Sequence, residues 1–552
     1  MSRFLSRILE DPQSGAFNAD TSRLFAYHQA TKHTFHSVRS SANILDWKNQ
    51  PNPFRLYEGA PLVALSPEPH LPDVGTFESM RRLAGSPPAF DQETNIGHET
   101  SHLNLNLDLV SQLLWHSMAV SSWKKIPNTG DRYSLRVNPS SGNLHPTETY
   151  LGISDFQGLD NGLYHYRADR HALELRSPGE WTRRLTRELR IEEFGAPALI
   201  IGLTSIFWRE AWKYRERAYR YCCHDLGHAM MSILLAAGAL GLHGGAIGQF
   251  GDARLSRSLG LLGGDEAPMA FLVFPSFQSK EQSLSFPQEE FFGTANELSA
   301  EESPCDLLLE MHRATILQEF ALQPVTKNKE CGENRFPGKP ETDRPLRRVV
   351  RLRRSALDFD PQSSLMARTE LEKLLEFATL DWPADWRGNL LNASISRAKP
   401  QAFVTLYLYI HRVSGCDPGV YRWHGSTRSL QQLHHGDVKR AAAFLSLEQS
   451  LAANGCLVIS MIADLQSAAQ IFGNRGYRYV YFEAGAIGQR LYLGAEALGW
   501  NATGIGAFYD DDVHRYLGFL DENAQADSSK LPRQVIYHFA IGRAIRDPRI
   551  EA

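Results

Sequence analysis

The sequence predicts an α+β fold built from two tandem units, and three observations indicate this. The segment 219–260 returns without a gap as 477–518, with about 16 of roughly 42 aligned positions identical. Strand and hairpin patterns recur at nearly the same interval, about 257 or 258 residues further along the chain. Strands mixed with helices and joined by tight hairpins favour two α+β units over a doubly wound sheet. Because a dimeric fold can be fused end to end, the duplication predicts an intramolecular pseudo-dimer.

Each copy of the repeat begins with a helix. Apolar residues recur at every third or fourth position over 226–240, which predicts a helix that buries one broad face. Gly241 and Gly499 stand where the two helices should end. The glycine-rich segments 244–248 and 504–506 follow, and they allow a tight turn or a close approach of backbone amides to a ligand.

The first unit is predicted over residues 1–285. Its first 100 residues are rich in Pro, Asn, Ser and His, and we expect them to form an irregular wrap over the first core. The patterns that follow predict, in order, a helix over 105–118, polar turns over 132–143, a strand over 149–153, a hairpin from Gly162, and buried strands over 198–203 and 269–274.

The second unit is predicted over residues 346–552 and repeats that order. Its elements are a hairpin from Gly419, a buried strand over 456–461 and a closing strand over 535–540. Residues 286–345 connect the units. They are predicted to contain a helix over 306–322 and a charged linker with Pro and Gly over 323–343.

The composition limits the classes of protein. The chain has 552 residues, of which 43% are hydrophobic, and a formal net charge of -4, so it can bury two cores and has no bulk attraction to nucleic acid. Neither a signal peptide nor a membrane span is predicted, so we expect a cytoplasmic protein with no nucleic-acid or membrane partner. The six irregularly spaced cysteines are expected to be reduced. A buried helix explains four residues that could otherwise suggest a metal site, namely Cys222, Cys223, His224 and His228.

Two motifs differ between the units. The first unit has the sequence PSSGN at 139–143 before a strand, where the second unit has SRAKP at 396–400. The second unit opens with RLRRSALDF at 351–359, a cationic cluster with a helical run, which suits a phosphate group. Nothing of that form opens the first unit. Each half therefore holds what the other lacks.

The RRSxxxF opening, the PSSGN turn, the GLYHY hairpin and the ATGIGAF segment together resemble the nitroreductase superfamily of FMN enzymes, specifically its SagB-type dehydrogenase branch in tandem form. The resemblance covers nearly the whole chain, and it implies two nitroreductase-like domains with one FMN site at their interface. It places the FMN phosphate on Arg353, Arg354 and Ser355, with Arg543 as a further cation. It places Gly504, Ile505 and Gly506 against the flavin, with Pro139, Ser140, Ser141 and Asn143 reaching it from the first unit.

Two departures qualify the resemblance. Leu357 stands where the family usually has Arg or Lys, which bears on the affinity for phosphate. The opposite interface would need the SRAKP segment to act as the turn, so we expect it to be empty.

The SagB-type branch also has a Lys-Tyr pair, which corresponds to Lys213 and Tyr214 here, whereas the second unit has Ile471 and Phe472. Loss of a hydride to flavin requires a base for the accompanying proton, which such a pair can supply. The first hypothesis is therefore an FMN-dependent oxidoreductase that removes two electrons from a peptide or modified amino acid. The alternatives are an NAD(P)H-dependent reductase of nitro compounds or quinones, and a flavin-free scaffold. The fold alone does not choose among them.

Overall fold

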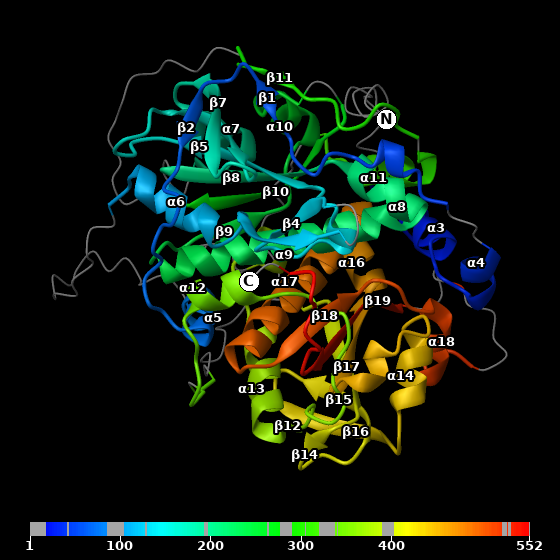
Figure 1. The fold of residues 1–552 in the computed structure, drawn as a ribbon. Coiled ribbons are helices and arrows are strands. Elements are labelled where there is room, and N and C mark those ends of the chain that lie inside the picture. The colour runs from blue at the N-terminus through cyan, green and yellow to red at the C-terminus, as the bar shows by residue number, and fades with distance from the viewer. Residues whose placement is uncertain are drawn as a thin grey trace.

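The structure is a computed structural model that describes residues 18–40, 44–85, 104–126, 130–192, 197–261, 264–275, 290–303, 305–318, 337–338, 340–388, 402–521, 527 and 532–550. Figure 1 shows two sheet-containing units with two long helices between them, α9 (Ala218–Ala239) and α17 (Gly476–Ala497). No helix within these ranges combines the length and the apolar character that crossing a membrane requires.

The two main sheets have the same strand order. The first runs β2-β7-β6-β5-β8-β10-β9 and the second β16-β15-β13-β17-β19-β18, with antiparallel neighbours throughout, so six strands correspond one to one and β2 is added at the edge of the first. The prediction of two tandem α+β units is confirmed. The bounds are β2 Leu62–Ala64, β5 Thr147–Ile153, β6 Gly162–Arg167, β7 Ala172–Pro178, β8 Leu199–Ser205, β9 Gly245–Ile247, β10 Ala267–Phe274, β13 Val404–Ile410, β15 Gly419–His424, β16 Ser429–His435, β17 Leu457–Asp464, β18 Asn501–Ile505 and β19 Arg533–Gly542.

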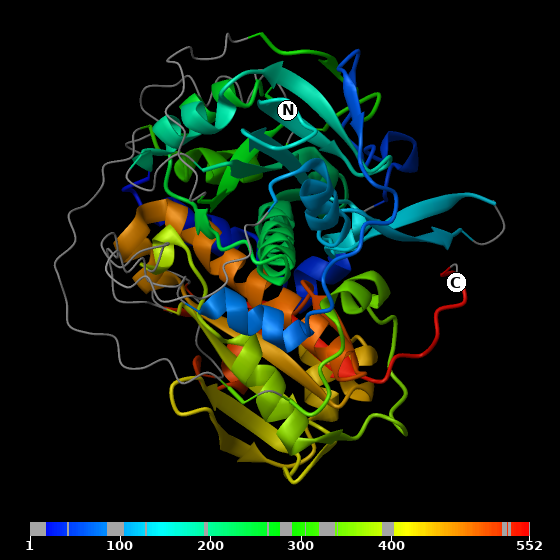
Figure 2. The ribbon, with the colours of Figure 1, turned by 90° about the vertical axis from the view of Figure 1, so that its left-hand side faces the viewer.

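Smaller elements surround these sheets, and Figure 2 shows the helices from a second direction. Three short strand pairs are β1 Tyr57–Glu58 with β11 Thr294–Ala295, β3 Val120–Lys125 with β4 Arg132–Arg136, and β12 Met366–Ala367 with β14 Val413–Ser414. The other helices are α3 Ser22–Ala30, α4 Phe35–Ser40, α5 Thr76–Ala84, α6 Leu107–Trp115, α7 Trp181–Leu189, α8 Phe207–Tyr214, α10 Asp252–Ser258, α11 Asp306–Ala314, α12 Leu346–Leu352, α13 Arg368–Ala378, α14 Lys439–Leu445, α15 Leu451–Asn454, α16 Leu465–Phe472 and α18 Asp510–Tyr516.

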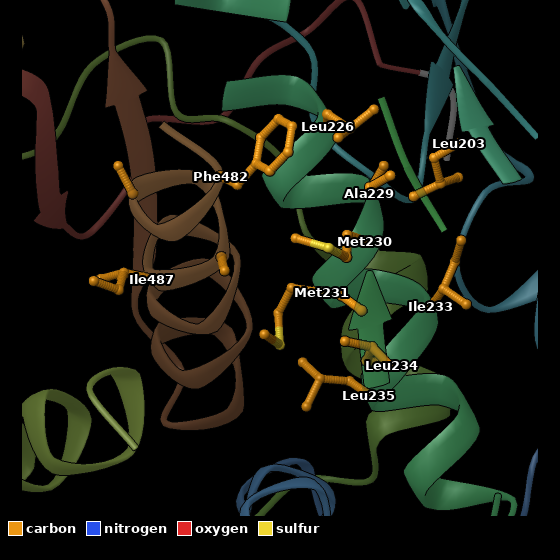
Figure 3. Packing of buried hydrophobic residues seen from close by; sticks show 14 of the residues in the cluster. Leu203, Leu226, Ala229, Met230, Met231, Ile233, Leu234, Leu235, Phe482 and Ile487 are labelled. Carbon is orange, nitrogen blue, oxygen red and sulfur yellow. The ribbon is translucent and has the colours of Figure 1, made fainter. Parts of the chain in front are cut away.

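Helices α9 and α17 pack directly on each other. Every residue of α9 is buried, so the predicted single buried face is wrong: one side covers its own sheet and the other side contacts α17. In Figure 3, Ile233 lies beside Leu203 of the sheet, whereas Met231 lies on the side that faces α17. The two helix backbones meet at Gly227 and Gly485. A Cβ on Gly227 would lie 2.4 Å from the carbonyl oxygen of Phe482, so glycine permits this close approach. The helices end as predicted at Gly241 and Gly499, both with positive φ.

Ion pairs repeat across this contact. Asp510 accepts from Arg217 at 3.2 Å and from Arg220 at 3.0 Å, and its counterpart Asp252 pairs with Arg475 at 2.6 Å and Arg478 at 3.2 Å. Each pair joins a helix of one unit to the other unit. The two units therefore form an intramolecular pseudo-dimer held by the same buried charges on both sides.

Three sequence predictions need correction. Residues before 100 are not simply irregular, because they contain α3 and α5, and they also contact the second unit, with His28 Nδ1 3.2 Å from the Tyr477 hydroxyl. The polar 132–143 segment includes the strand β4, which pairs with β3. The helix predicted over 306–322 ends at Ala314, and residues 319–336 lie outside the described ranges.

The helical run predicted after the arginines is also wrong. Helix α12 includes Arg351 and ends at Leu352, before Arg353 and Arg354, and the chain then runs alongside β18 through a bridge between Ser355 and Ala502. Pairing with the open edge of the sheet satisfies backbone groups that a helix would otherwise satisfy internally. The SRAKP segment at 396–400 lies outside the described residues, and the domain boundaries near 285 and 345 stay predictions.

Candidate functional site

The turn at 139–143 is held from below by one carboxylate of α9. Asp225 accepts hydrogen bonds from Ser140 Oγ at 2.6 Å, from Ser141 Oγ at 2.9 Å and from the Ser141 amide at 3.0 Å. Gly142 and Asn143 both have positive φ, which makes the turn tight. The hydroxyl protons of the two serines thus point at the Asp225 carboxylate. The outer side of the turn is half-exposed and is therefore accessible to a ligand.

Arg353 crosses from the second unit to the strand that leads into this turn. Its Nη2 donates to the carbonyl of Arg136 at 3.1 Å and its Nε to that of Val137 at 3.3 Å, two residues before Pro139. The guanidinium also lies 5.1 Å from the centre of the Tyr492 ring. The first-unit turn and the second-unit arginine are therefore at the same place in the molecule, which we call the first seam.

Three arginines gather at the first seam, where Glu496 is near enough to raise the pKa of Arg353 and Arg354 but forms no ion pair with them. Within the described residues, Arg351, Arg353 and Arg354 form no ion pair, and they donate instead to backbone carbonyls and to Ser121. Burial and the charges of its two neighbours lower the pKa of Arg354 to about 10, and burial lowers the pKa of Arg353. Arg354 Nε is buried without a partner. Partly desolvated like charges are costly unless an anion is present, so this arginine cluster fits a phosphate group.

A hydroxyl of α17 links the two predicted cofactor motifs of the second unit. The Tyr492 hydroxyl lies 2.8 Å from Ser355 Oγ and accepts from the Gly504 amide at 2.8 Å. A Cβ on Gly504 would lie 2.0 Å from the Tyr537 hydroxyl, and one on Gly506 would lie 2.2 Å from the Tyr221 ring. Both positions therefore require glycine.

The backbone after Gly504 is open to a ligand. Strand β18 is an edge strand, and no side chain in the described part of the chain accepts from the amides of Gly506 or Ala507. The Gly506 carbonyl is held by the Tyr221 hydroxyl at 3.0 Å and by Arg217 at 3.2 Å. Fixed backbone with two free amides is suited to an acceptor-rich ring such as the pyrimidine part of a flavin.

Lys213 and Tyr214 lie against the 139–143 turn, at the C-terminal end of α8. A Cβ on Gly142 would lie 2.7 Å from the Tyr214 hydroxyl and 3.2 Å from Lys213 Nζ. Burial, followed by the charge of Glu210, raises the pKa of Tyr214 well above its usual value, so its phenol stays protonated. The Tyr214 phenol is therefore a hydrogen-bond donor beside the Lys213 side chain and not a base.

Arg543 lies in a different environment from the arginine cluster. Its guanidinium donates to the carbonyl of Gly499 and lies 3.9 Å above the Trp500 ring. The structure thus places it at the C-terminal end of α17. The Leu357 side chain is 51% exposed, so it occupies no part of the protein core.

Several residues at the first seam were not predicted from the sequence. They are Glu210, Asp225, His228, Tyr492 and Tyr537, of which His228 Nε2 lies 3.1 Å from the Tyr537 hydroxyl. A comparison of the repeats could have identified Glu210, because its counterpart in α16 is the buried Ala468. Cys222, Cys223 and His224 are buried in α9, and no group of metal-ligating side chains occurs among the described residues.

The equivalent place on the other side of the molecule, where the strand end at Gly248 of the first unit meets Asp385 and Trp386 of the second unit, is called the second seam. The amides of Gly248 and Gln249 donate to Asp385 at 3.0 and 2.9 Å. The Trp386 ring is stacked on Tyr479 with 4.9 Å between ring centres and an interplanar angle of 4°. A Cβ on Gly248 would lie 2.6 Å from Tyr479 and 2.8 Å from Trp386. The same backbone is thus covered by a carboxylate and an indole ring.

The sequence matches the model of the nitroreductase family twice, at residues 104–274 and 350–526. The chain belongs to the nitroreductase family. The two matches contain all strands of the two main sheets except β2 and β19, and they contain the turn, the arginine cluster and the glycine-rich strand end. The protein therefore has two nitroreductase-family domains in one chain.

Individual relatives support the fold. A protein named as a nitroreductase from Methanocaldococcus jannaschii is 30% identical over 112 residues, 20% of this chain and 57% of that protein. The trifolitoxin-processing protein TfxB of Rhizobium leguminosarum bv. trifolii is 30% identical over 200 residues, 31% of this chain and 52% of that protein. The chain thus spans about half the length of these curated relatives. A solved structure named as a nitroreductase from Anabaena variabilis covers 95% of this chain and 99% of its own, with a TM-score of 0.68 at 24% identity.

Proposed function

We propose that the chain is an FMN-dependent oxidoreductase of the SagB type, with one flavin site at the first seam. One observation carries the proposal: the arginine cluster of the second unit, which forms no ion pair among the described residues, meets the 139–143 turn of the first unit, beside the amides of Gly506 and Ala507 that no described side chain caps. A flavin-free scaffold would have no use for three gathered arginines that lack an anion.

The proposed substrate is a peptide or a modified amino acid that loses two electrons. The similarity to a trifolitoxin-processing protein supports a peptide, since that relative is named for processing a peptide toxin. Reduction of nitro compounds or quinones with NAD(P)H is the alternative chemistry in this family. We further expect the protein to act in the cytoplasm.

The roles of the side chains follow from their positions. Bound FMN would supply the acceptor for the hydride. Arg353, Arg354 and Ser355 would hold its phosphate, and the glycine-rich strand end would lie against its ring. The Lys213 amine would take the proton that leaves the substrate, and the neutral Tyr214 hydroxyl would donate a hydrogen bond beside it.

Flavin identification in the purified protein is the direct test. We expect FMN, released by denaturation, at about one per chain, and bleaching by a candidate peptide without NADPH. The variant Lys213→Ala should keep its FMN but lose about 100-fold to 10,000-fold in turnover, the usual contribution of a general base. Bleaching by NADPH with no response to peptides would support the reductase, and a colourless protein that takes up no FMN would overturn the proposal.

A further inference from the structure

Two buried carboxyl groups lie beneath the 139–143 turn, on neighbouring helices. Glu210 of α8 is 0% exposed and Asp225 of α9 is 2% exposed, and the two carboxyl groups are close enough to act on each other's pKa. Neither carboxyl oxygen of Glu210 receives a hydrogen bond from any donor in the described part of the chain. A hydrogen bond between two carboxyl groups requires a proton on one of them.

Neither carboxyl group is ion-paired within the described residues. Among the described residues neither Glu210 nor Asp225 forms an ion pair with Lys or Arg, although Lys213 is close enough to Glu210 to lower its pKa. Burial raises the pKa of Asp225 to about 7, although hydrogen bonds from Ser140 and Ser141 lower it. Burial and the charge of Asp225 raise the pKa of Glu210 well above its usual value. Two carboxyl groups in such a site do not both ionise near neutral pH.

The second unit shows that the fold does not need this pair. The counterpart of Glu210 in α16 is Ala468, which is fully buried, and Ile471 and Phe472 replace Lys213 and Tyr214. The counterpart of Asp225 is Glu483, which accepts from backbone amides at the start of β13 and from Arg387 at 3.2 Å. The unpaired acid and the Lys-Tyr pair therefore occur together at the first seam and are absent together from α16.

The pair is placed to exchange protons with the proposed base. Lys213 and Tyr214 follow Glu210 by three and four positions, so all three side chains project from one side of α8. Asp225 holds the turn whose Gly142 contacts both of them. The other titratable groups on which the charge of the pair acts are Tyr214 of α8, Cys222 of α9 and Tyr537 of β19.

We propose that Glu210 and Asp225 share one proton as a buried acid pair, and that this pair takes a proton from the Lys213 ammonium, which frees the Lys213 amine to accept the proton of the substrate. The inference rests on the proposed oxidation. In that reaction the hydride would pass to the flavin, the ionised carboxylate of the pair would take a proton from the ammonium, and the resulting amine would take the proton that leaves the substrate. The pair would then release one proton to solvent after the product leaves. Glu210 acts through Lys213 and is a positioning residue.

The shared proton can be tested without flavin or substrate. Infrared spectra of the whole chain at pH 8 should contain the carbonyl band of a buried, protonated carboxylic acid. That band should be lost in Glu210→Gln, and in Glu210→Ala if glutamine perturbs the turn. The control Glu483→Gln should retain it, because Glu483 has a guanidinium partner. A band that persists in both Glu210 variants overturns the inference.

Turnover separates this inference from the proposed function. In protein loaded with FMN, Glu210→Gln should lower kcat by about 10-fold to 100-fold and leave KM and flavin content unchanged, since the residue does not touch substrate. Glu483→Gln should leave kcat unchanged. If the acid band responds as described but the chain takes up no FMN, the proposed function fails and the acid pair stands. An unchanged kcat in both Glu210 variants overturns the relay.

Discussion

The two seams of this molecule share the same backbone arrangement, but different side chains contact it. At the second seam, Asp385 caps the amides of Gly248 and Gln249, and Trp386 is stacked on Tyr479. At the first seam, the corresponding amides of Gly506 and Ala507 have no side-chain acceptor among the described residues. Arg217 and Arg475 nevertheless hold the carbonyls of Gly506 and Gly248 in the same way.

The comparison separates structural residues from site residues. The arginine-aspartate pairs occur at both seams, so they belong to the framework. In the sequence, the arginine cluster, the 139–143 turn and the Lys213-Tyr214 pair each occur in one copy only, so we assign them to the proposed site. A duplicated chain can retain its two-fold packing with a site at a single seam, because the packing needs both copies and the chemistry needs one.

The largest effect should come from the shared framework. Asp510→Asn and Asp252→Asn should each lower the free energy of unfolding by about 3–5 kcal/mol, because each leaves two buried arginines without their carboxylate. Chemical denaturation at pH 7 measures both. If one substitution is nearly neutral and the other severe, the two-fold framework is contradicted.

The lowered pKa of Asp510 also determines how the stability of the protein changes at low pH. Burial raises its pKa, but Arg217 and Arg220 outweigh this and lower the pKa to about 2. A carboxylate with a lowered pKa in the folded state stabilises the protein above its ordinary pKa, and the contribution is lost as the pH falls toward 2. The stability difference between the wild type and Asp510→Asn should therefore shrink between pH 4 and pH 2.

Cofactor binding should respond to the arginine cluster alone. Arg353→Ala should weaken FMN binding by about 10-fold to 100-fold, the value of a charge-assisted contact with phosphate. Arg348→Ala is the matched control, because Arg348 is exposed on α12, the helix that ends directly before Arg353. Fluorescence titration with FMN measures both variants, and equal affinities would contradict the phosphate site.

A methyl group added at equivalent glycines should act differently at the two seams. Gly506→Ala would force the Tyr221 ring away from the strand end and should reduce the FMN content, whereas Gly248→Ala would press on Tyr479 and Trp386. We expect a loss of about 1–3 kcal/mol in stability from Gly248→Ala, with its FMN content unchanged. Loss of flavin from both variants would show that both seams bind it.

A further effect concerns the pH dependence of stability. The pKa of Glu210 is raised in the folded protein, so folding retains a proton that the unfolded chain releases. The wild type should lose stability as the pH rises above about 4.5, at up to about 1.4 kcal/mol per pH unit for one proton. Glu210→Gln should flatten this slope and be relatively more stable at pH 8 than at pH 5. Thermal unfolding across this range provides the measurement.

Local patterns in the sequence were sufficient for much of the fold. The hairpins at Gly162 and Gly419 and the buried strands were predicted because strand alternation and turn residues are local signals. The complete burial of α9 was not predicted, because its second partner is α17, more than 200 residues away in the sequence. The extended course after Leu352 was missed for the same reason, since the edge of β18 competes with the helix.

The candidate site divides in a similar way. The Lys213-Tyr214 pair and the 139–143 turn were predicted from motifs, and the structure brings them together. The role of Asp225 in fixing the turn was not predicted, because one carboxylate on a buried helix has no local signature. Arg543 was assigned by resemblance to the phosphate, and the structure shows its guanidinium at Gly499. Contacts across a domain interface depend on packing that no single segment encodes.

A single flavin site at the first seam is tested by the number of FMN molecules bound per chain at saturation, in the wild type and in Arg353→Ala and Arg348→Ala. We expect one FMN per chain for the wild type and Arg348→Ala, and much weaker binding for Arg353→Ala. Two FMN molecules per chain, or unchanged binding in Arg353→Ala, would contradict a single site at the first seam.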